Sequence, residues 1–151
     1  GLTLNERLIT RRRRIVTRIQ ETIGQGLINN ETYTSMSDRL KSELEGDYPK
    51  AMRIVRTESH RVQEGGKRES LEHAANQGIE MKKYWIDSAD ERTRESHVEM
   101  GEKYSEENAI PIDEPFVNGE TGGEGQHPGD LGTAEDDINC RCVTGYVVEK
   151  D

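Results

Sequence analysis

Residues 136–143 read "DDINCRCV", and they hold both cysteines of the chain, Cys140 and Cys142, with Arg141 between them. From Cys140 to Lys150 apolar and polar residues alternate well enough to predict the last β-strand of the fold. Neighbouring residues on a strand face opposite sides, so the cysteines are expected to share one side and Arg141 to face the other. We therefore expect the two cysteines to close a core.

Arg141 is then expected to meet an acidic partner on its own side of the strand. The loop that carries Glu120, Glu124 and Asp130 is the candidate partner, because it is rich in acidic residues. On this hypothesis, removing the Arg141 side chain loosens that loop and leaves the helices intact.

The two thiols invite three interpretations. A disulfide between Cys140 and Cys142 would close a very small strained ring, so we exclude it as a stable feature. Zinc binds thiolates, but a four-coordinate ion would need two more ligands. The candidates are His60, His97 and His127. In the alternative interpretation, the two cysteines are small buried residues of the last strand, and the pattern alone leaves these two alternatives open.

Upstream of the cysteines, the amino-acid composition of the chain changes at residue 101. Residues 101–139 are rich in glycine, proline and acidic residues, which predicts a long irregular loop that is functional or pinned by a contact. Within it, "EPFVN" at 114–118 is a candidate short strand. Before it, "KKYWID" at 82–87 predicts the first strand, and "ADERTRESHVEM" at 89–100 predicts a short helix.

The first half of the chain predicts helices. In the first helix Thr3 and Glu6 form a capping box, apolar residues recur at helical spacing, and Gly24 with Gly26 supplies the end. A second helix is expected over 30–45, capped by Asn30. A third, long and bent or kinked at its central glycines, is expected over 47–77.

These elements together predict an α+β fold. We expect N-terminal helices, including one long helix, packed on a small β-sheet with a long Gly/Pro-rich loop. The expected division is a helical extension over residues 1–46 and a domain over residues 47–151. The chain starts at Gly1 and not at methionine, so we expect the natural protein to extend further upstream.

Composition and charge narrow the possible functions. The net charge is -9, but residues 1–70 hold 14 basic and 10 acidic residues, whereas residues 71–151 hold 7 basic and 20 acidic ones. Contact with phosphate is therefore expected only at the basic front end. No run of eighteen apolar residues is present, so no membrane span is predicted. The low cysteine count suits a reducing, cytoplasmic origin.

The basic residues near the N-terminus cluster at Arg11, Arg12, Arg13, Arg14 and Arg18. These arginines are candidates for binding nucleic acid. Four consecutive helical residues spread over about 300° of the circumference, so they cannot all face one partner. A solvated helix face is one interpretation, and a contact with phosphate or an acidic protein surface is the other.

Histidines and charged residues recur in "RTESHR" at 56–61 and "DERTRESH" at 90–97. If Glu58, His60, Arg94 and His97 met in space, they could carry acid–base chemistry on a phosphodiester. The alternative is a structural network of ion pairs, as such spacings usually indicate.

Taken in order, "RTESHR", "KKYWIDSADERTRESHVEMGEK", "EPFVNGETGGEGQHPGD" and "INCRCV" resemble the phage head morphogenesis family, with its Mu F and SPP1 minor capsid protein-like domain. The resemblance covers residues 50–148, and each motif is weak alone while the ordered set is specific. The matching positions are Arg56, Thr57, Glu58, Trp85, Asp90, Arg92, Thr93, Arg94, His97, Gly101, Phe116, Pro128, Asn139, Cys140, Arg141 and Cys142.

The resemblance implies a minor head protein of the virion, located inside the phage head near the portal and assembled in the host bacterial cytoplasm. Its implied partners are the portal protein or other capsid proteins and double-stranded DNA, with no membrane. It does not require enzyme activity or a cofactor. The rival hypothesis is a metal-dependent nuclease or hydrolase that uses His97 with Cys140 and Cys142, with His60 as a further ligand and zinc as the metal.

Overall fold

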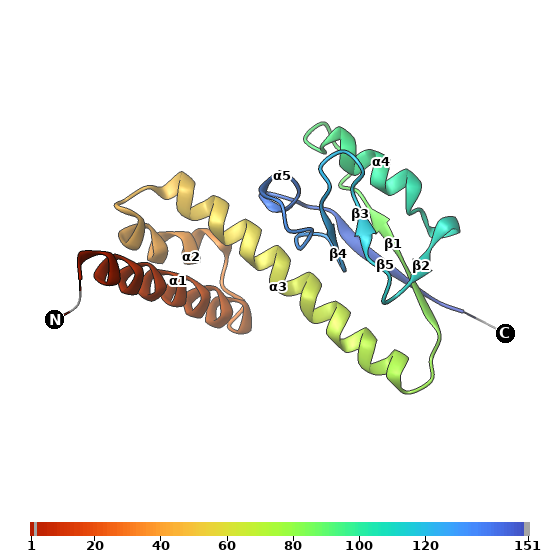
Figure 1. The fold of residues 1–151 in the computed structure, drawn as a ribbon, viewed down its shortest axis with the longest axis horizontal. Coiled ribbons are helices and arrows are strands. Elements are labelled where there is room, and N and C mark those ends of the chain that lie inside the picture. Colours follow the sequence, from red (N-terminus) through yellow and green to blue (C-terminus); the bar gives the residue numbers. More distant parts are fainter. Residues whose placement is uncertain (2, 150–151) are drawn as a thin grey trace. The chain divides into compact units, whose positions relative to one another are not determined.

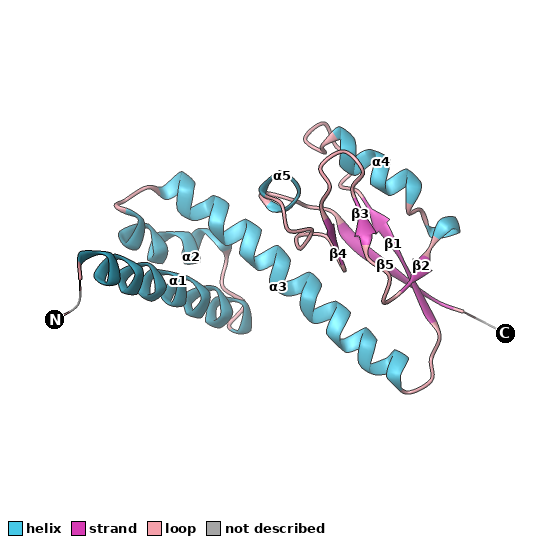
Figure 2. Ribbon diagram, in the orientation of Figure 1, coloured by secondary structure: helices cyan, strands magenta, loops and turns pink. Residues whose placement is uncertain are grey.

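The computed structural model describes Gly1 and residues 3–149, and it divides the chain into two compact units, Gly1–Ser59 and His60–Asp151. The long helices come first in the chain, and the strands follow with shorter helices between them, as Figure 1 and Figure 2 show. The predicted α+β class is confirmed. The predicted boundary at residue 46 stays a prediction, while the structural division falls inside a continuous helix.

The N-terminal unit is built from helix α1 (Leu4–Ile28), helix α2 (Tyr33–Leu40), the 3-10 turn η1 (Lys41–Leu44) and the start of helix α3 (Tyr48–Asn76). The capping box of Thr3 and Glu6 is confirmed at the start of α1. The predicted end at Gly24 is wrong, because α1 continues to Ile28. Gly26 instead lets α1 approach α2, since a Cβ there would lie 2.2 Å from the Met36 sulfur.

The second helix also begins later than predicted. Thr32, and not Asn30, caps α2 by accepting a hydrogen bond from the Ser35 backbone. The small core of this unit consists of Ile23, Met36, Leu40, Ala51 and Val55. These residues come from α1, α2 and α3, so tertiary packing, and not helix propensity alone, holds the three helices together.

Helix α3 is continuous through both of its central glycines, as the prediction of one long helix required. In the C-terminal unit its side chains hold strand β5 (Val143–Val148) by polar contacts to one backbone position. Lys67 Nζ donates to the Thr144 carbonyl at 2.8 Å, and the Thr144 N–H donates to Glu64 Oε1 at 3.2 Å. This segment of α3 therefore fixes the chain directly after the cysteines.

The main sheet of the C-terminal unit is antiparallel with the strand order β2-β1-β5. Strand β1 (Met81–Ile86) confirms the prediction at "KKYWID", and it pairs with β5 and with the two-residue strand β2 (Ile110–Pro111). A second ribbon pairs β3 (Phe116–Val117) with β4 (Glu124–Gly125). The candidate strand at "EPFVN" is thus confirmed as β3.

Two predicted boundaries in this unit are wrong. Helix α4 (Glu95–Lys103) starts at the Arg94 cap, because residues 90–93 form a turn closed by hydrogen bonds to the Asp90 carboxylate and carbonyl. The last strand starts at Val143, so Cys140 and Cys142 precede it. The predicted end of that strand at Lys150 lies outside the described residues.

The long loop is pinned at several points. It contains the 3-10 turn η2 (Glu106–Asn108), the two-residue strands and the four-residue helix α5 (Ala134–Asp137). Its apolar residues join the core of the C-terminal unit, which consists of Trp85, Met100, Tyr104, Phe116, Leu131, Cys140 and Cys142. The prediction that the cysteines close a core is confirmed.

Candidate metal centre

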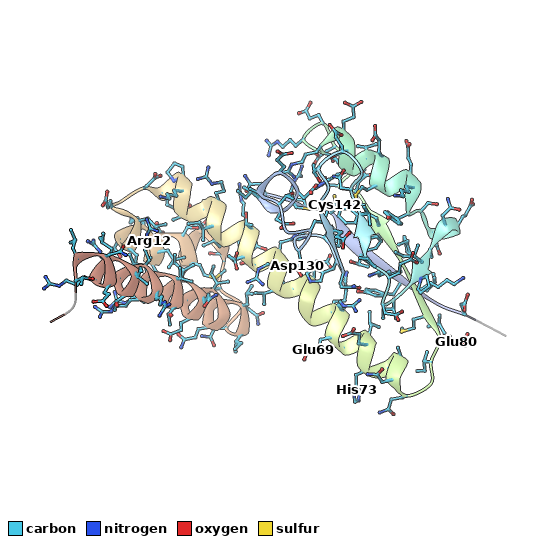
Figure 3. All side chains as sticks on the ribbon, viewed as in Figure 1. Arg12, Glu69, His73, Glu80, Asp130 and Cys142 are labelled. Carbon is cyan, nitrogen blue, oxygen red and sulfur yellow. The ribbon has the colours of Figure 1, made fainter. Side chains whose placement is uncertain are left out.

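The two cysteines face the imidazole of His97, which helix α4 carries into the core. The Nδ1 atom of His97 lies 3.6 Å from the Cys142 sulfur and 3.9 Å from the Cys140 sulfur. One ligand atom from each of the three residues lies within 4.8 Å of the other two. All three side chains are at most 3% exposed, and Figure 3 labels Cys142 within the C-terminal unit.

A buried carboxylate holds the other side of the imidazole. Asp136, in α5, is fully buried, and its Oδ1 atom lies 3.0 Å from His97 Nε2. The same oxygen accepts a hydrogen bond from Asn118 Nδ2 at 2.7 Å. The hydroxyls of Thr121 and Thr133 donate to Oδ2 at 2.5 and 2.6 Å.

The direction of these hydrogen bonds follows from the backbone. The Thr133 hydroxyl accepts from the Asp136 N–H, and the Thr121 hydroxyl accepts from the Gly123 N–H, so each hydroxyl proton is directed to the carboxylate. Asp136 is therefore surrounded by donors, which is the environment of an ionised carboxylate. Nε2 of His97 must then carry a proton.

These contacts shift the pKa values of both partners. Burial raises the pKa of Asp136, but the hydrogen bonds from Thr121, Thr133 and His97 outweigh it and the net pKa is lowered. Burial lowers the pKa of His97, whereas its hydrogen bonds to Cys140 and Asp136 raise it, and the net pKa is raised. The pair is thus an ionised acid beside a base whose proton it stabilises.

The two thiols are not equivalent. A hydrogen bond from Cys140 lowers the pKa of Cys142, against burial. The hydrogen bond to Cys142, followed by burial, raises the pKa of Cys140. The rings of Trp85 and His97 also pack in a T-shaped arrangement, with centroids 5.5 Å apart.

His60 lies away from the three ligand atoms. Its Nε2 atom lies 2.6 Å from the Cys142 carbonyl oxygen, so His60 contacts the backbone of Cys142 whereas His97 contacts its sulfur. His127 bonds the Pro128 carbonyl through Nδ1. The structure thus brings together His97, Cys140 and Cys142 from the predicted ligand set and leaves His60 outside it.

Arg141 faces away from the two thiols, as predicted, but its partner differs from the prediction. Its guanidinium donates to both carboxylate oxygens of Asp90 at 2.5 and 2.7 Å. This bidentate pair lowers the pKa of Asp90 to about 2. The loop of Glu120, Glu124 and Asp130 is not the acidic partner, because the turn before α4 presents Asp90 directly to Arg141.

The other motif residues divide between core and surface. Trp85 is in the core, and Arg94 donates to the Ile138 carbonyl, which ties the start of α4 to the segment before the cysteines. Arg56, Asp90, Arg92 and Asn139 are exposed, and Glu58 is half-buried. Asn139 has a positive φ of 55°, which is a turn conformation that asparagine tolerates.

Sequence reasoning missed Asp136 and three of its donors, Asn118, Thr121 and Thr133. A usable signal is present, because Thr133 stands three residues before Asp136 at the spacing of a helix N-cap. Asn118 and Thr121 follow β3 in a tight turn, in which Asn118 Oδ1 accepts from the backbone of residues 120 and 121. Local turn chemistry predicts such a turn, but not that its side chains meet a carboxylate 15 and 18 residues later in the chain.

The predicted nucleic-acid residues lie on α1. Arg11, Arg12, Arg13 and Arg14 are all exposed, and Figure 3 labels Arg12 there. Arg18 pairs with Glu43 at 2.6 Å. A cavity of about 550 Å³ lies beside these residues; its lining includes Leu8, Arg11, Arg12, Arg14, Ile15 and Glu45.

No helix among the described residues has the length and apolar character that crossing a membrane requires.

Comparison with known proteins gives two relatives and no matching solved structure. Minor head protein GP7 of Bacillus phage SPP1 is 36% identical over 148 residues, which cover 98% of this chain and 46% of that protein. NAD(+)--arginine ADP-ribosyltransferase EFV of Enterococcus faecalis is 32% identical over 149 residues, which cover 99% of this chain and 29% of that protein. The chain spans less than half the length of each.

The model of the family described as Phage Mu protein F like protein matches residues 17–145, which is most of the chain. The match includes the arginines from Arg18 onward, all three residues of the candidate metal centre and the Asp136 carboxylate. The chain therefore belongs to the Phage Mu protein F like family of phage minor head proteins.

Proposed function

We propose that this chain acts in head morphogenesis inside the virion, near the portal vertex, and that α1 is the element that contacts the portal protein or another capsid protein. The relative named as a minor head protein supports this role, because its similarity extends over nearly the whole chain. Assembly would take place in the host cytoplasm before DNA is packaged.

The observation that carries the proposal is the surface of α1. Leu4 is 74% exposed, and Leu8, Ile9 and Val16 are between 43% and 51% exposed, although all are large and apolar. Exposed apolar residues gathered on one element are typical of a protein-binding surface. The arginines between them would add charge attraction and fix the orientation of the partner.

The test is co-expression with the portal protein and the major capsid protein of the same phage, followed by affinity capture of the portal protein. The chain should be captured with it, and the double substitution Leu8→Ser with Val16→Ser should reduce the captured amount at least tenfold. Gln25→Ala, exposed on the same helix, is the matched control and should leave capture unchanged. Capture that is equal for all three chains would contradict the role of α1.

DNA contact is a second candidate function, because Arg11, Arg12, Arg13 and Arg14 are all exposed on α1. Binding through phosphates falls steeply as salt rises, since each neutralised phosphate releases counterions. Replacing Arg12 and Arg13 by alanine should then weaken binding to all DNA sequences equally and flatten the salt dependence. A binding constant that does not change with salt excludes this contact.

A further inference from the structure

The cluster of His97, Cys140 and Cys142 has the composition and spacing of a transition-metal site. An ion with Zn–S bonds of about 2.3 Å and a Zn–N bond of about 2.0–2.1 Å, in tetrahedral geometry, has N···S edges of about 3.5 Å. The observed edges from His97 Nδ1 are 3.6 and 3.9 Å. We propose that these three side chains bind one zinc ion, and that Asp136 positions His97 for it.

The hydrogen-bond network prepares His97 as a ligand. Because Asp136 is surrounded by donors, His97 must present a protonated Nε2 to it, and the lone pair of neutral imidazole then lies on Nδ1. Nδ1 is the atom that faces both sulfurs. A carboxylate on the far side of a ligating histidine fixes its tautomer and ring orientation and increases its basicity.

The charge of the proposed centre suits its burial. Zinc displaces the two thiol protons, so the ion and two thiolates have no net charge, and His97 is neutral. A neutral centre has a much smaller desolvation cost in the core than an isolated ion would have. The Asp136 charge is satisfied separately by its hydrogen bonds from His97, Asn118, Thr121 and Thr133.

The fourth position of the ion is open to a small ligand such as water. Among the described residues, His97, Cys140 and Cys142 are the group of potential ligands within mutual reach. His60 Nε2 is bonded to the Cys142 carbonyl and His127 is bonded to its own segment. All three ligands are at most 3% exposed, so a nucleic-acid strand cannot reach the ion and the centre cross-links the fold rather than cutting a substrate.

The zinc ion would cross-link segments of the C-terminal unit that are distant in sequence. His97 comes from α4, the cysteines precede β5, and Asp136 belongs to α5. A ligand that binds only the folded state raises stability by mass action. Zinc would therefore hold the long loop against the sheet.

The test is metal analysis of the untagged full chain, expressed in zinc-containing medium and purified without chelator. We expect one zinc per chain, and background zinc in Cys142→Ser and in His97→Ala. His73→Ala is the matched control, because His73 is exposed near the end of α3 (Figure 3), and it should keep the full equivalent. Asp136→Asn should weaken zinc binding about 10- to 100-fold in competition with a chromophoric chelator.

A second, spectroscopic measurement on the unsubstituted chain tests the proposal even if a cysteine variant fails to fold. Cobalt(II) titrated into the unsubstituted chain after metal removal should give the sulfur-to-cobalt charge-transfer band and the intense visible bands of a tetrahedral thiolate site. Circular dichroism checks that the metal-free chain is folded. Background zinc together with an octahedral cobalt spectrum would overturn the proposal, and so would a full zinc equivalent in folded Cys142→Ser. None of these outcomes depends on the portal contact of α1.

Discussion

Asp136 determines how the candidate centre is organised at the scale of single residues. Its carboxylate accepts from His97, Asn118, Thr121 and Thr133, which belong to α4, the turn after β3 and the N-cap of α5. One fully buried charge therefore joins three segments that are distant in sequence. Its four donors make its burial tolerable, because an unpaired carboxylate in the core would be very costly.

The Asp90–Arg141 pair gives a pH-dependent prediction. The hydrogen bond from Arg141 is the largest cause that lowers the pKa of Asp90 to about 2. The unfolded value is about 3.9, so the contribution of the pair to stability is complete above that pH and is lost as the pH falls toward 2. An NMR titration of the Asp90 carboxyl should give an apparent pKa near 2. In Arg141→Ala it should rise toward about 3.9, and an unchanged value would show that Arg141 is not the cause.

Lys83 is a buried lysine on β1 that gives a pH dependence of the same sign as Asp90, but in the alkaline range. Burial, followed by repulsion from Arg68, lowers the pKa of Lys83 from 10.5 to about 7. Its ammonium donates to the carbonyl and to the side-chain oxygen of Gln126, both at 2.9 Å. Because the unfolded state keeps its proton to higher pH, the free energy of unfolding should rise between pH 7 and 10.5.

Denaturant unfolding at a series of pH values checks this prediction. The rise should disappear in Lys83→Met and should remain in Lys82→Met, whose side chain is 40% exposed in the native protein. Equal pH slopes in the two variants would rule out Lys83 as the source. Each variant removes one lysine from the unsubstituted chain, so a loss of the rise in Lys83→Met alone assigns it to Lys83.

For single residues, the sequence predicted which way the side chains of the cysteine segment face but not what they contact, and it wrongly placed the cysteines inside the last strand. Alternation placed Cys140 and Cys142 together and Arg141 opposite, and the structure has that arrangement. The choice of Asp90 as the partner of Arg141 depends on a turn with Ala89 at a positive φ of 53°, and no periodicity reports such a turn. Asp136 could not be recognised as a central residue, because its four partners meet only in the folded chain.

The helices and strands also divide into those whose bounds follow from the local sequence and those whose bounds depend on tertiary contacts. The long helix α3 and strand β1 were predictable, because their patterns extend over many residues. The start of α4 was not, since Asp90 uses its side chain to close a turn where helix formers alone suggest a helix. The extension of α1 past Gly24 and Gly26 follows from contact with α2, which overrides the low helix propensity of glycine.

The β3–β4 ribbon offers a test of the loop at the scale of an element. A Cβ at Gly125 would lie 1.9 Å from the Asp130 carbonyl oxygen, which is backbone and cannot rotate away. Gly125→Ala should therefore destabilise the protein by about 1–3 kcal/mol. Gly119→Ala is the matched control, because a Cβ there meets nothing within 4 Å.

Chemical denaturation of the two variants measures the difference. The midpoint of Gly125→Ala should fall well below that of Gly119→Ala, with the same dependence on denaturant. Coincident midpoints would mean that the loop moves aside at no cost and is not pinned as the structure indicates.

In the whole molecule, the change from basic to acidic composition along the chain follows the change from the helical unit to the unit that contains the sheet. The basic arginines lie in the helical N-terminal unit, and the acidic residues accumulate in the C-terminal unit, which holds the sheet and the candidate metal centre. Composition predicted this charge asymmetry directly. The division after Ser59 lies within a continuous helix and has no signal in the sequence pattern. The ordered motifs identified the family, although several motif residues prove to hold the fold instead of forming an exposed site.

The proposed centre has His97, Cys140 and Cys142 as ligands of one zinc ion, with the Asp136 carboxylate bonded to the far side of the histidine. X-ray absorption at the zinc edge of the zinc-loaded chain measures this ligand set. We expect two sulfur ligands at about 2.3 Å and a histidine nitrogen at about 2.0–2.1 Å, with one light atom in the remaining position. A shell of nitrogen and oxygen atoms with no sulfur would place the zinc elsewhere on the protein and would overturn the proposal.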